Sequence, residues 1–257
     1  MKTELSELIE ISRYYGTGKD YVIAGGGNTS FKDEHYIWIK ASGYPLGSLS
    51  MEGLVKLDRR KLEVISGKKY SDNPLAREEE VKNDLTLAVE KEFTGMRPSV
   101  ETSLHNLIGY SFVVHLHPAV INGVLCSRKA ETIVRENFGD EALFIPYADP
   151  GYTLFKKLEK EISGYRDIKN RDPHIIFIEN HGIFVGADTT IEIRRIYEEI
   201  INIFSALYKP VPEEGEFGFN PLLAEVLPAI RMLLSRDSLK ILRWRNNALI
   251  DSFSKSQ

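Results

Sequence analysis

The segments PSVETSLH (residues 98–105) and FVVHLHP (residues 112–118) place a carboxylate and two histidines within a short length of chain. The second segment is apolar and rich in β-branched residues until Pro118 ends it, so it predicts a short strand followed by a turn. Side chains two residues apart on a strand point to the same face, so His115 and His117 can converge on one point. The carboxylate, Glu101, lies on an expected helix.

A third histidine, His181, interrupts the run IIFIENHGIFVG (residues 175–186). This run is also apolar and rich in strand-forming residues, and its Asn-His-Gly corner predicts a hairpin. Three neutral imidazoles with an open fourth position are typical of a catalytic zinc site rather than a closed structural one. Glu101 would then be either a further ligand or a proton carrier.

Each histidine also has a purely structural interpretation. A lone strand histidine is usually a hydrogen-bonded core or surface residue, and a His-x-His pair is only a moderate metal signal by itself. What favours a metal site is that three of the six histidines fall at two strand ends. His105 lies four residues after Glu101 on the same expected helix face, and we interpret it as a structural hydrogen-bonding residue rather than a ligand.

Size and composition favour one domain with a small helical tail. The chain has 257 residues, of which 42% are hydrophobic, so it can bury a substantial core. A net charge of -4, with acidic and basic residues mixed throughout, argues against a nucleic-acid partner. Cys126 is the single cysteine, which excludes an intrachain disulfide and fits a reducing cytosol. Without a signal peptide or an apolar run long enough to span a bilayer, we expect a cytoplasmic protein with no membrane partner.

Two polar corners precede the carboxylate. In AGGGNTSFK (residues 24–32), three consecutive glycines expose backbone amides as phosphate-binding nests do, and neutral donors follow them. For a glycine run alone, a flexible hairpin turn is the simpler alternative, because the spacing fits neither nucleotide-binding fingerprint. A second corner, ASGYP (residues 41–45, the Ser-Gly corner), follows an expected strand at residues 36–40. This corner is an ordinary turn unless it lies beside the glycine loop, where it could contribute to the same binding site.

The remaining sequence alternates expected helices and strands. Hydrophobic spacing predicts helices at residues 4–15, 49–57, 76–93, 119–126, 130–136, 152–162 and 190–208, and a strand at residues 143–146. Residues 61–65 are expected to be an exposed segment. The run KPVPEEG (residues 209–215) is the one convincing linker. It divides the chain into a domain at residues 1–208 and a tail at residues 209–257, with helices expected at 221–234 and 238–252 and with the tail packing on the domain.

Together these motifs resemble the class II aldolase/adducin family, in which the same pieces occur in the same order. They are the glycine-Asn-Thr-Ser loop, the Ser-Gly corner, Pro-Ser-x-Glu with His four residues later, the His-x-His strand and the Asn-His-Gly hairpin. Within the family, the chain looks most like fuculose- and rhamnulose-1-phosphate aldolases. Residues 77–80 and 98–102 resemble the aldolase part of longer aldolase/dehydrogenase proteins, and we expect no dehydrogenase domain here.

The resemblance implies a fold and a set of site residues. It implies a single α/β domain in α/β/α layers, with a largely antiparallel central sheet, that assembles as a homotetramer with sites at subunit boundaries. By position, it makes zinc ligands of His115, His117 and His181, with manganese or cobalt as alternatives. It makes Glu101 the carboxylate that ligates the resting metal and carries the proton. It places substrate phosphate on Gly27, Asn28, Ser42, Gly43 and Ser99.

The chain departs from the family pattern at Val100, where many members have a second phosphate-binding serine. This departure leaves open a more loosely held phosphate or a substrate without one. No clear counterpart is found for the tyrosine that serves as a second acid in the fuculose enzyme, and Tyr147 and Tyr208 are candidates by residue type alone.

The implied activity is metal-dependent cleavage of a ketose 1-phosphate to dihydroxyacetone phosphate and an aldehyde, with a sugar phosphate as the small-molecule partner. Alternatives within the family are a pentulose-phosphate 4-epimerase, a sugar-phosphate dehydratase and a sugar-acid decarboxylase. Family epimerases usually have Asp where Glu101 stands, which favours cleavage. A non-catalytic scaffold like the adducin head lacks the zinc histidines, whereas all three are present in this sequence.

Overall fold

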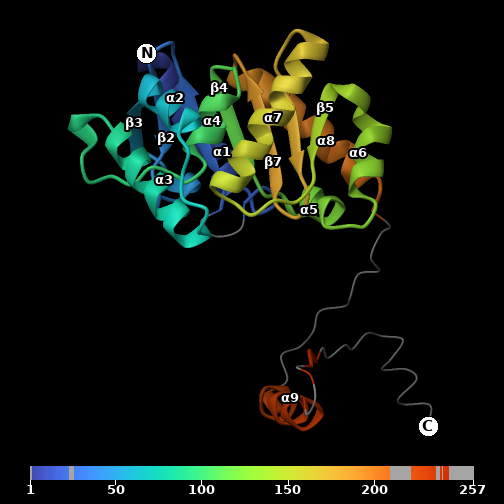
Figure 1. Ribbon diagram of the computed structural model, residues 1–257. Helices are drawn as coiled ribbons and strands as arrows, with labels where there is room; N and C mark the ends of the chain where they lie inside the picture. The colour runs from blue at the N-terminus through green and yellow to red at the C-terminus, as the bar shows by residue number, and fades with distance from the viewer. Residues whose placement is uncertain (1, 23–25, 209–220, 236–237, 239, 243–257) are drawn as a thin grey trace, which may run out of the picture. The chain divides into compact units, whose positions relative to one another are not determined.

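The computed structural model describes residues 2–22, 26–208, 221–235, 238 and 240–242 (Figure 1). The chain divides into two compact units, Met1–Leu207 and Tyr208–Gln257. The packing of the tail on the first unit stays a prediction, and so does the linker at residues 209–215, which lies outside the described residues.

A single mixed sheet forms the centre of the first unit. Within the described residues it has seven strands in the order β3-β2-β1-β4-β7-β6-β5. Neighbouring strands are antiparallel except β5 and β6, which pair in parallel. This confirms the expected α/β fold with a largely antiparallel sheet. The strands are β1 Asn28–Lys32, β2 Tyr36–Lys40, β3 Leu54–Asp58, β4 Phe112–Leu116, β5 Ala142–Ile145, β6 Ile175–Ile178 and β7 Gly182–Ala187.

Helices cover both faces of this sheet, and Figure 1 shows α4 and α7 in front of the strands. One core cluster packs beneath the helices α1 Lys2–Thr17, α5 Ala119–Leu125, α6 Ala130–Phe138 and α8 Thr190–Ser205. On the opposite face, two further clusters pack beneath α2 Arg59–Gly67, α3 Pro74–Ala88, α4 Thr102–Leu107 and α7 Tyr152–Lys169. The sheet is therefore buried on both sides, in the expected α/β/α arrangement.

Alternation along β4 decides which face each side chain enters. Val114 and Leu116 belong to the cluster beneath α1 and α8, whereas Val113 packs with residues of α4 and α7. His115 lies two residues after Val113 and is therefore on the same face of the strand, so it points toward α4. Because every residue of β4 is buried, this imidazole lies inside the fold rather than on its surface. Its ring stacks there on Phe184 of β7.

The predicted start of α8 is confirmed in detail. The hydroxyl oxygen of Thr189 accepts a hydrogen bond of 3.2 Å from the backbone N–H of Glu192, as an N-cap residue does. The helix buries Ile193, Ile196, Tyr197, Ile200 and Phe204, and it ends at Ser205 rather than at the predicted residue 208.

The helix predicted at residues 49–57 is wrong. This segment forms a short 3-10 turn, Met51–Gly53, and then the strand β3, which pairs with β2 through Ile39 and Val55. The predicted exposed segment at residues 61–65 belongs to α2, which begins where the side chain of Asp58 accepts from the backbone N–H of Arg60. Three apolar residues over four positions suit a helix turn or a strand equally, and the pairing with β2 decides between them.

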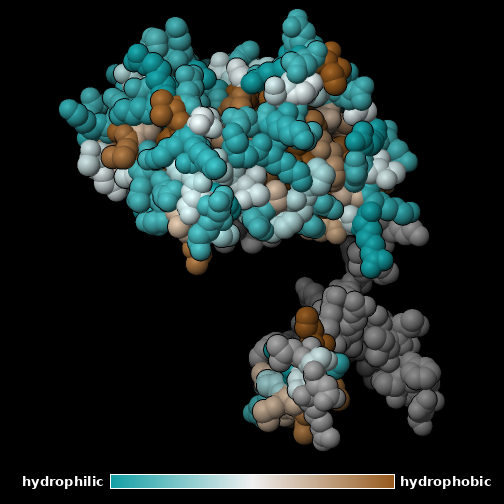
Figure 2. All heavy atoms as spheres, in the orientation of Figure 1, coloured by the Kyte–Doolittle hydropathy of each residue, from teal (hydrophilic) through white to brown (hydrophobic). Residues whose placement is uncertain are grey.

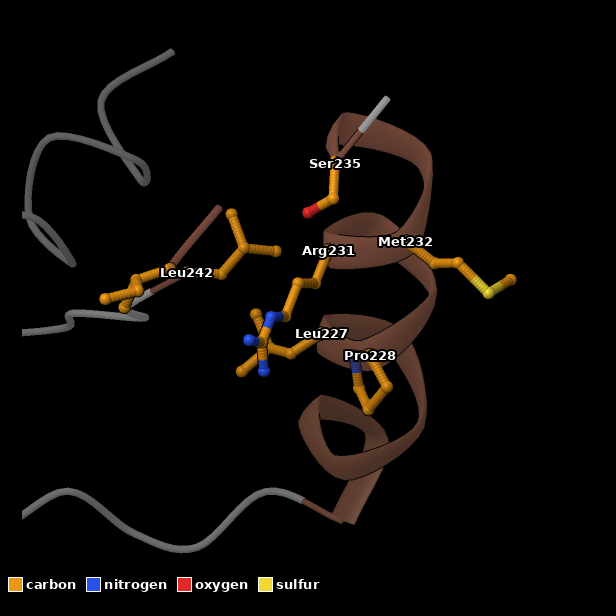
Figure 3. Close-up of a pocket in the computed structure, with 7 residues that line it drawn as sticks. Leu227, Pro228, Arg231, Met232, Ser235 and Leu242 are labelled. Carbon is orange, nitrogen blue, oxygen red and sulfur yellow. The ribbon is translucent and has the colours of Figure 1, made fainter. Parts of the chain in front are cut away.

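In the C-terminal unit, α9 Pro221–Leu234 matches the predicted helix and contains Pro228 in its interior. A cavity of about 680 Å³ lies along it, lined by Leu227, Pro228, Arg231, Met232, Ser235, Ile241 and Leu242. Figure 3 shows Leu227 and Arg231 on the side of α9 toward Leu242, with Met232 directed away. The second tail helix, expected at residues 238–252, lies largely outside the described residues.

The surface seen in Figure 2 is mostly hydrophilic over the first unit, with apolar residues scattered among the polar ones. Among the described residues, no helix combines the length and the apolar character needed to cross a bilayer.

Candidate metal centre

Three histidines converge where β4 ends and β7 begins. His115 is on β4, His117 follows its last residue, and His181 lies in the turn between β6 and β7. One ligand nitrogen from each lies within 4.8 Å of the others, and the Nε2 atoms of His115 and His117 are 2.8 Å apart. The sheet register explains this meeting, because Leu116 pairs with Ile183 and the turn before β7 therefore reaches the end of β4.

The ring of His115 is held from two sides. Its Nδ1 lies 3.0 Å from the carbonyl oxygen of Ile183, and its ring stacks on Phe184 with centroids 4.0 Å apart. A carbonyl oxygen only accepts, so Nδ1 carries the hydrogen and Nε2 keeps a lone pair. Metal-ligating histidines usually have this kind of outer hydrogen bond. His115 therefore presents a free lone pair to the place where the other two histidines meet.

Burial keeps the imidazoles of His115 and His117 neutral. Removal from water lowers the pKa of His115 to about 3. Burial also lowers the pKa of His117, and the neighbouring His181 lowers it further. A divalent cation needs the lone pair of a neutral imidazole. At neutral pH these two rings are therefore in the form that binds a metal.

Gly182 leaves room for the rings. A Cβ atom at this position would lie 2.4 Å from Cδ2 of His117 and 2.6 Å from the carbonyl oxygen of Leu116. It would also lie 3.3 Å from Cε1 of His115. No side chain fits at the first two distances without movement of a ring or of the backbone. The Asn-His-Gly turn thus provides one histidine and, through its glycine, the space for the other two.

Glu101 faces the histidines with one carboxylate oxygen and Asn28 with the other. Its Oε1 lies 3.4 Å from Nε2 of His115 and 3.3 Å from Nε2 of His181. Its Oε2 accepts a hydrogen bond of 2.6 Å from the side-chain amide of Asn28. Burial raises the pKa of Glu101, but the two imidazoles and the hydrogen bond from Asn28 outweigh burial and lower it below its ordinary value. The carboxylate is therefore ionised.

The residues of this cluster fit a divalent transition metal. Imidazole nitrogens with a nearby carboxylate are the ligands that catalytic zinc uses, and imidazole also suits neighbouring first-row metals. Nε2 of His115 and Nε2 of His181 both face Oε1 of Glu101, and Nε2 of His117 lies 2.8 Å from Nε2 of His115. The Nε2 atoms of the three rings and one carboxylate oxygen therefore gather at one place, as ligands of a single cation would.

Two of the phosphate candidates, Asn28 and Ser99, are hydrogen-bonded to Glu101. The hydroxyl oxygen of Ser99 accepts from the side-chain amide of Asn28 at 3.4 Å and from the backbone N–H of Glu101 at 3.2 Å. The backbone N–H of Ser42 donates to the carbonyl oxygen of Arg97 at 2.8 Å. The Ser-Gly corner therefore runs beside the segment that leads into Glu101.

The two glycines among the phosphate candidates both have left-handed backbone conformations. Gly27 has a φ of 76° and Gly43 a φ of 92°, where other residues are strained. A Cβ on Gly27 would lie 2.8 Å from the carbonyl oxygen of His115, because β1 and β4 pair there. Gly43 is exposed, and a Cβ built on it would have no atom within 4 Å. Residues 23–25 of the glycine loop lie outside the described residues.

A family model described as the Class II Aldolase and Adducin N-terminal domain matches residues 6–208, well over half of the chain. The chain belongs to the class II aldolase and adducin family. This membership agrees with the resemblance inferred from the order of the sequence motifs.

Solved structures of the class II aldolase fold are similar to the chain. The N-terminal class II aldolase domain of a conserved protein from Thermoplasma acidophilum has a TM-score of 0.66 and 23% identity, over 81% of this chain and 95% of that one. An L-fuculose-1-phosphate aldolase from Thermus thermophilus has a TM-score of 0.52 and 14% identity, over 80% of this chain and 95% of that one. At these identities the likeness establishes the fold alone.

Two curated proteins are similar to this chain in sequence. The uncharacterized oxidoreductase YuxG of Bacillus subtilis (strain 168) is 26% identical over 281 residues, covering 98% of this chain. A methylthioribulose-1-phosphate dehydratase of Citrobacter koseri is 27% identical over 135 residues, covering 50% of this chain. The matches span 38% and 51% of the lengths of these two relatives.

Sequence reasoning missed a buried lysine in this class II aldolase domain. Lys40, at the end of β2, is 6% exposed, and its Nζ donates to the carbonyl oxygen of Tyr44 at 2.9 Å. Burial lowers the pKa of Lys40, and the nearby Glu101 opposes that effect. Lys40 thus supports the Ser-Gly corner from inside. The available signal was a lysine that directly follows four strand-forming residues and precedes a turn.

The two tyrosine candidates for a second acid belong to different units of the chain. Tyr147 is exposed and donates its hydroxyl hydrogen to Oδ1 of Asp149 at 3.1 Å. Tyr208 is the first residue of the C-terminal unit. The identity of a second acid stays a prediction by residue type.

Proposed function

We propose that this chain is a metal-dependent aldolase that cleaves a ketose 1-phosphate, of the rhamnulose- or fuculose-1-phosphate type, into dihydroxyacetone phosphate and an aldehyde. The observation that carries the proposal is the position of Glu101. Its Oε1 lies within 3.4 Å of two imidazole nitrogens, while Asn28 holds its Oε2. A carboxylate placed beside a cation and tied at its other oxygen suits a proton carrier. Zinc is the expected metal, with manganese or cobalt as alternatives.

The residues of the site have separate tasks in this proposal. His115, His117 and His181 hold the cation, which when bound supplies Lewis-acid chemistry by polarising a carbonyl and offsetting developing negative charge. In the synthetic direction, ionised Glu101 takes a proton from the carbon of dihydroxyacetone phosphate that forms the new bond. In cleavage, the hydroxyl that becomes the aldehyde gives up its proton as the carbon–carbon bond breaks, Glu101 takes up a proton in exchange, and protonated Glu101 delivers it to the same carbon of dihydroxyacetone phosphate. The lowered pKa of Glu101 means that the resting protein holds the base form.

Neutral donors would hold the substrate phosphate. The candidates are backbone N–H groups at Gly27 and Gly43 and the hydroxyl groups of Ser42 and Ser99, as in phosphate-binding nests. Val100, where many family members have a second serine, is 57% exposed. Its apolar side chain is therefore directed largely to solvent, and phosphate binding depends on the remaining donors.

A second candidate function is removal of water from a sugar phosphate at the same site. The similarity to a methylthioribulose-1-phosphate dehydratase over half of the chain favours it. Glu rather than Asp at position 101 favours cleavage over epimerisation, and a sugar-acid decarboxylase is a further alternative. A non-catalytic scaffold is disfavoured, because the three histidines gather within 4.8 Å.

One panel of assays separates these functions. The purified chain, with its metal content measured, is incubated with rhamnulose 1-phosphate, fuculose 1-phosphate, ribulose 5-phosphate and methylthioribulose 1-phosphate, and products are followed by proton NMR. Lactaldehyde and dihydroxyacetone phosphate are expected from the first two. The Glu101→Gln variant should retain its metal and lose about 10²- to 10⁴-fold in kcat. A wild-type rate in that variant, or no lactaldehyde from either substrate, would overturn the proposal.

We also propose that the enzyme acts in the cytoplasm as a homotetramer, with its sites near subunit boundaries. Family resemblance supports this assembly. Sedimentation velocity of the purified chain tests it, and a monomer at assay concentration would contradict it.

A further inference from the structure

One buried face of strand β1 is polar. All five residues of β1 are buried. Alternation sends Thr29 toward α1, where its hydroxyl lies 2.7 Å from that of Ser12. The same alternation sends Asn28, Ser30 and Lys32 toward α4. Polar groups buried in this way need partners, and all three find one in the same residue, His105.

His105 is bonded through both ring nitrogens and through its backbone. Its Nδ1 lies 2.7 Å from the hydroxyl oxygen of Ser30, and its Nε2 contacts Oδ1 of Asn28. Its carbonyl oxygen accepts a hydrogen bond of 2.9 Å from Nζ of Lys32. The ring is fully buried and packs edge-on against Phe184, with centroids 5.4 Å apart. The imidazole is therefore fixed in position and orientation.

The carboxylate of Glu101 determines which atom donates and which accepts in the hydrogen bonds that join Glu101, Asn28, His105 and Ser30. An ionised carboxylate only accepts, so the Asn28 atom 2.6 Å from Oε2 of Glu101 is the amide nitrogen. Oδ1 of Asn28 therefore faces His105, and because a carbonyl oxygen only accepts, Nε2 of His105 carries the hydrogen. Burial lowers the pKa of His105 well below its ordinary value, so the ring is neutral and has one N–H. Nδ1 then accepts from the hydroxyl of Ser30.

We propose that His105 is a positioning residue for Glu101, acting through Asn28. The ordered chain runs from the Ser30 hydroxyl to the His105 ring, from that ring to the Asn28 amide, and from the amide to Oε2 of Glu101. It holds the amide with its NH₂ toward the carboxylate, since the reversed amide would set a carbonyl oxygen against a carboxylate oxygen. This inference rests on the proposed aldolase function, because proton delivery to a carbon atom tolerates little displacement of the donor.

Two substitutions of His105 test the role. His105→Phe keeps a ring of similar size without a donor, whereas His105→Gln restores an N–H that can reach Asn28. For His105→Phe we expect kcat to fall about 100-fold, with KM within about twofold and metal content unchanged. His105→Gln should recover about tenfold or more of the lost kcat.

His174 provides the matched control. Its Nδ1 is likewise hydrogen-bonded, here to the backbone carbonyl oxygen of Gly186 at 2.7 Å, and its ring stacks on Tyr110. His174→Phe and His174→Gln should leave kcat near that of the wild type. If Asn28 served phosphate alone, loss of His105 would raise KM and spare kcat. That result, or a Gln variant no better than the Phe variant, would overturn the proposal.

The tautomer of His105 can be measured without turnover. Nitrogen-15 NMR of the metal-loaded chain should show His105 with its hydrogen on Nε2, and Ser30→Ala should weaken that preference. Active protein with the hydrogen on Nδ1 would defeat the His105 proposal and leave the aldolase function standing. Protein inactive on every ketose phosphate would defeat the aldolase function, and the positioning role with it, whatever the tautomer.

Discussion

The side-chain amide of Asn122 on α5 donates a hydrogen bond of 3.0 Å to the backbone carbonyl of His181, a residue 59 positions later in the chain. The backbone N–H of Asn180 also donates to the carbonyl oxygen of Leu125, at the end of the same helix. Because α5 begins two residues after His117, this short helix joins the His-x-His strand to the turn that carries the third histidine. The three imidazoles therefore share one rigid support.

Loss of the Asn122 amide should weaken metal binding. Asn122→Ala removes the donor that holds the His181 turn, and such outer contacts usually change metal affinity by about 10- to 100-fold. Competition with a chelator of known affinity measures the change. Asn137→Ala is the control, because Asn137 makes a similar bond of 2.8 Å to a helix carbonyl at an exposed site on α6. Equal affinities in the two variants would contradict the prediction.

A methyl group at position 182 should disturb the metal centre. In Gly182→Ala the new Cβ would press on the His117 ring and on the carbonyl of Leu116, so that the ring must move. We expect substoichiometric zinc by atomic emission. Gly164→Ala is the matched control on α7, where a Cβ meets no atom within 4 Å. It should keep full zinc and gain about 0.5–1 kcal/mol of stability. Full zinc in both variants would show that the turn tolerates a side chain.

Removal of a candidate ligand should release the metal. His117→Ala takes away one of the three clustered imidazoles, and we expect most zinc to be lost during dialysis. His35→Ala changes an exposed histidine outside the cluster and should retain the wild-type zinc content. Retention of one zinc per chain in His117→Ala would remove that residue from the ligand set.

The metal-free chain should lose stability as the pH falls below neutrality. Burial lowers the pKa of His115 to about 3, against an ordinary value of 6.5, so the unfolded state binds more protons between these values. The stabilisation from neutral His115 is therefore present above pH 6.5 and is lost progressively toward pH 3. In this window its loss is about 1.4 kcal/mol per pH unit.

Urea unfolding of the metal-free protein between pH 7.5 and pH 5 measures this slope. His115→Gln, which does not titrate, should show a shallower dependence than the wild type. The other buried histidine outside the cluster, His105, adds to the slope in both proteins, because its pKa is also lowered by burial. Identical slopes in wild type and His115→Gln would contradict the assignment.

The local sequence pattern was sufficient to predict that the three histidines lie together. It was not sufficient to predict the residues that surround them. Strand alternation predicts that His115 and His117 converge, and the Asn-His-Gly turn predicts the hairpin that brings His181 to them. The polar face of β1 was not predicted, because its partner His105 lies 73 residues beyond Lys32 and is revealed only by packing. The same limit explains the wrong helix at residues 49–57, where pairing with a separate strand outweighs a local pattern that fits either structure.

The contrast between Gly27 and Gly43 indicates where this protein can be altered. A Cβ atom at Gly27 would lie 2.8 Å from the carbonyl oxygen of His115, so almost any replacement there would press on the strand that carries this histidine. Gly43 and Ser42 lie exposed, with unfilled space beside the glycine. In the proposed function this exposed rim would hold the substrate phosphate, so a substitution at Ser42 should change substrate binding and leave the histidine cluster in place, whereas the left-handed φ of Gly43 disfavours a side chain there in spite of the space.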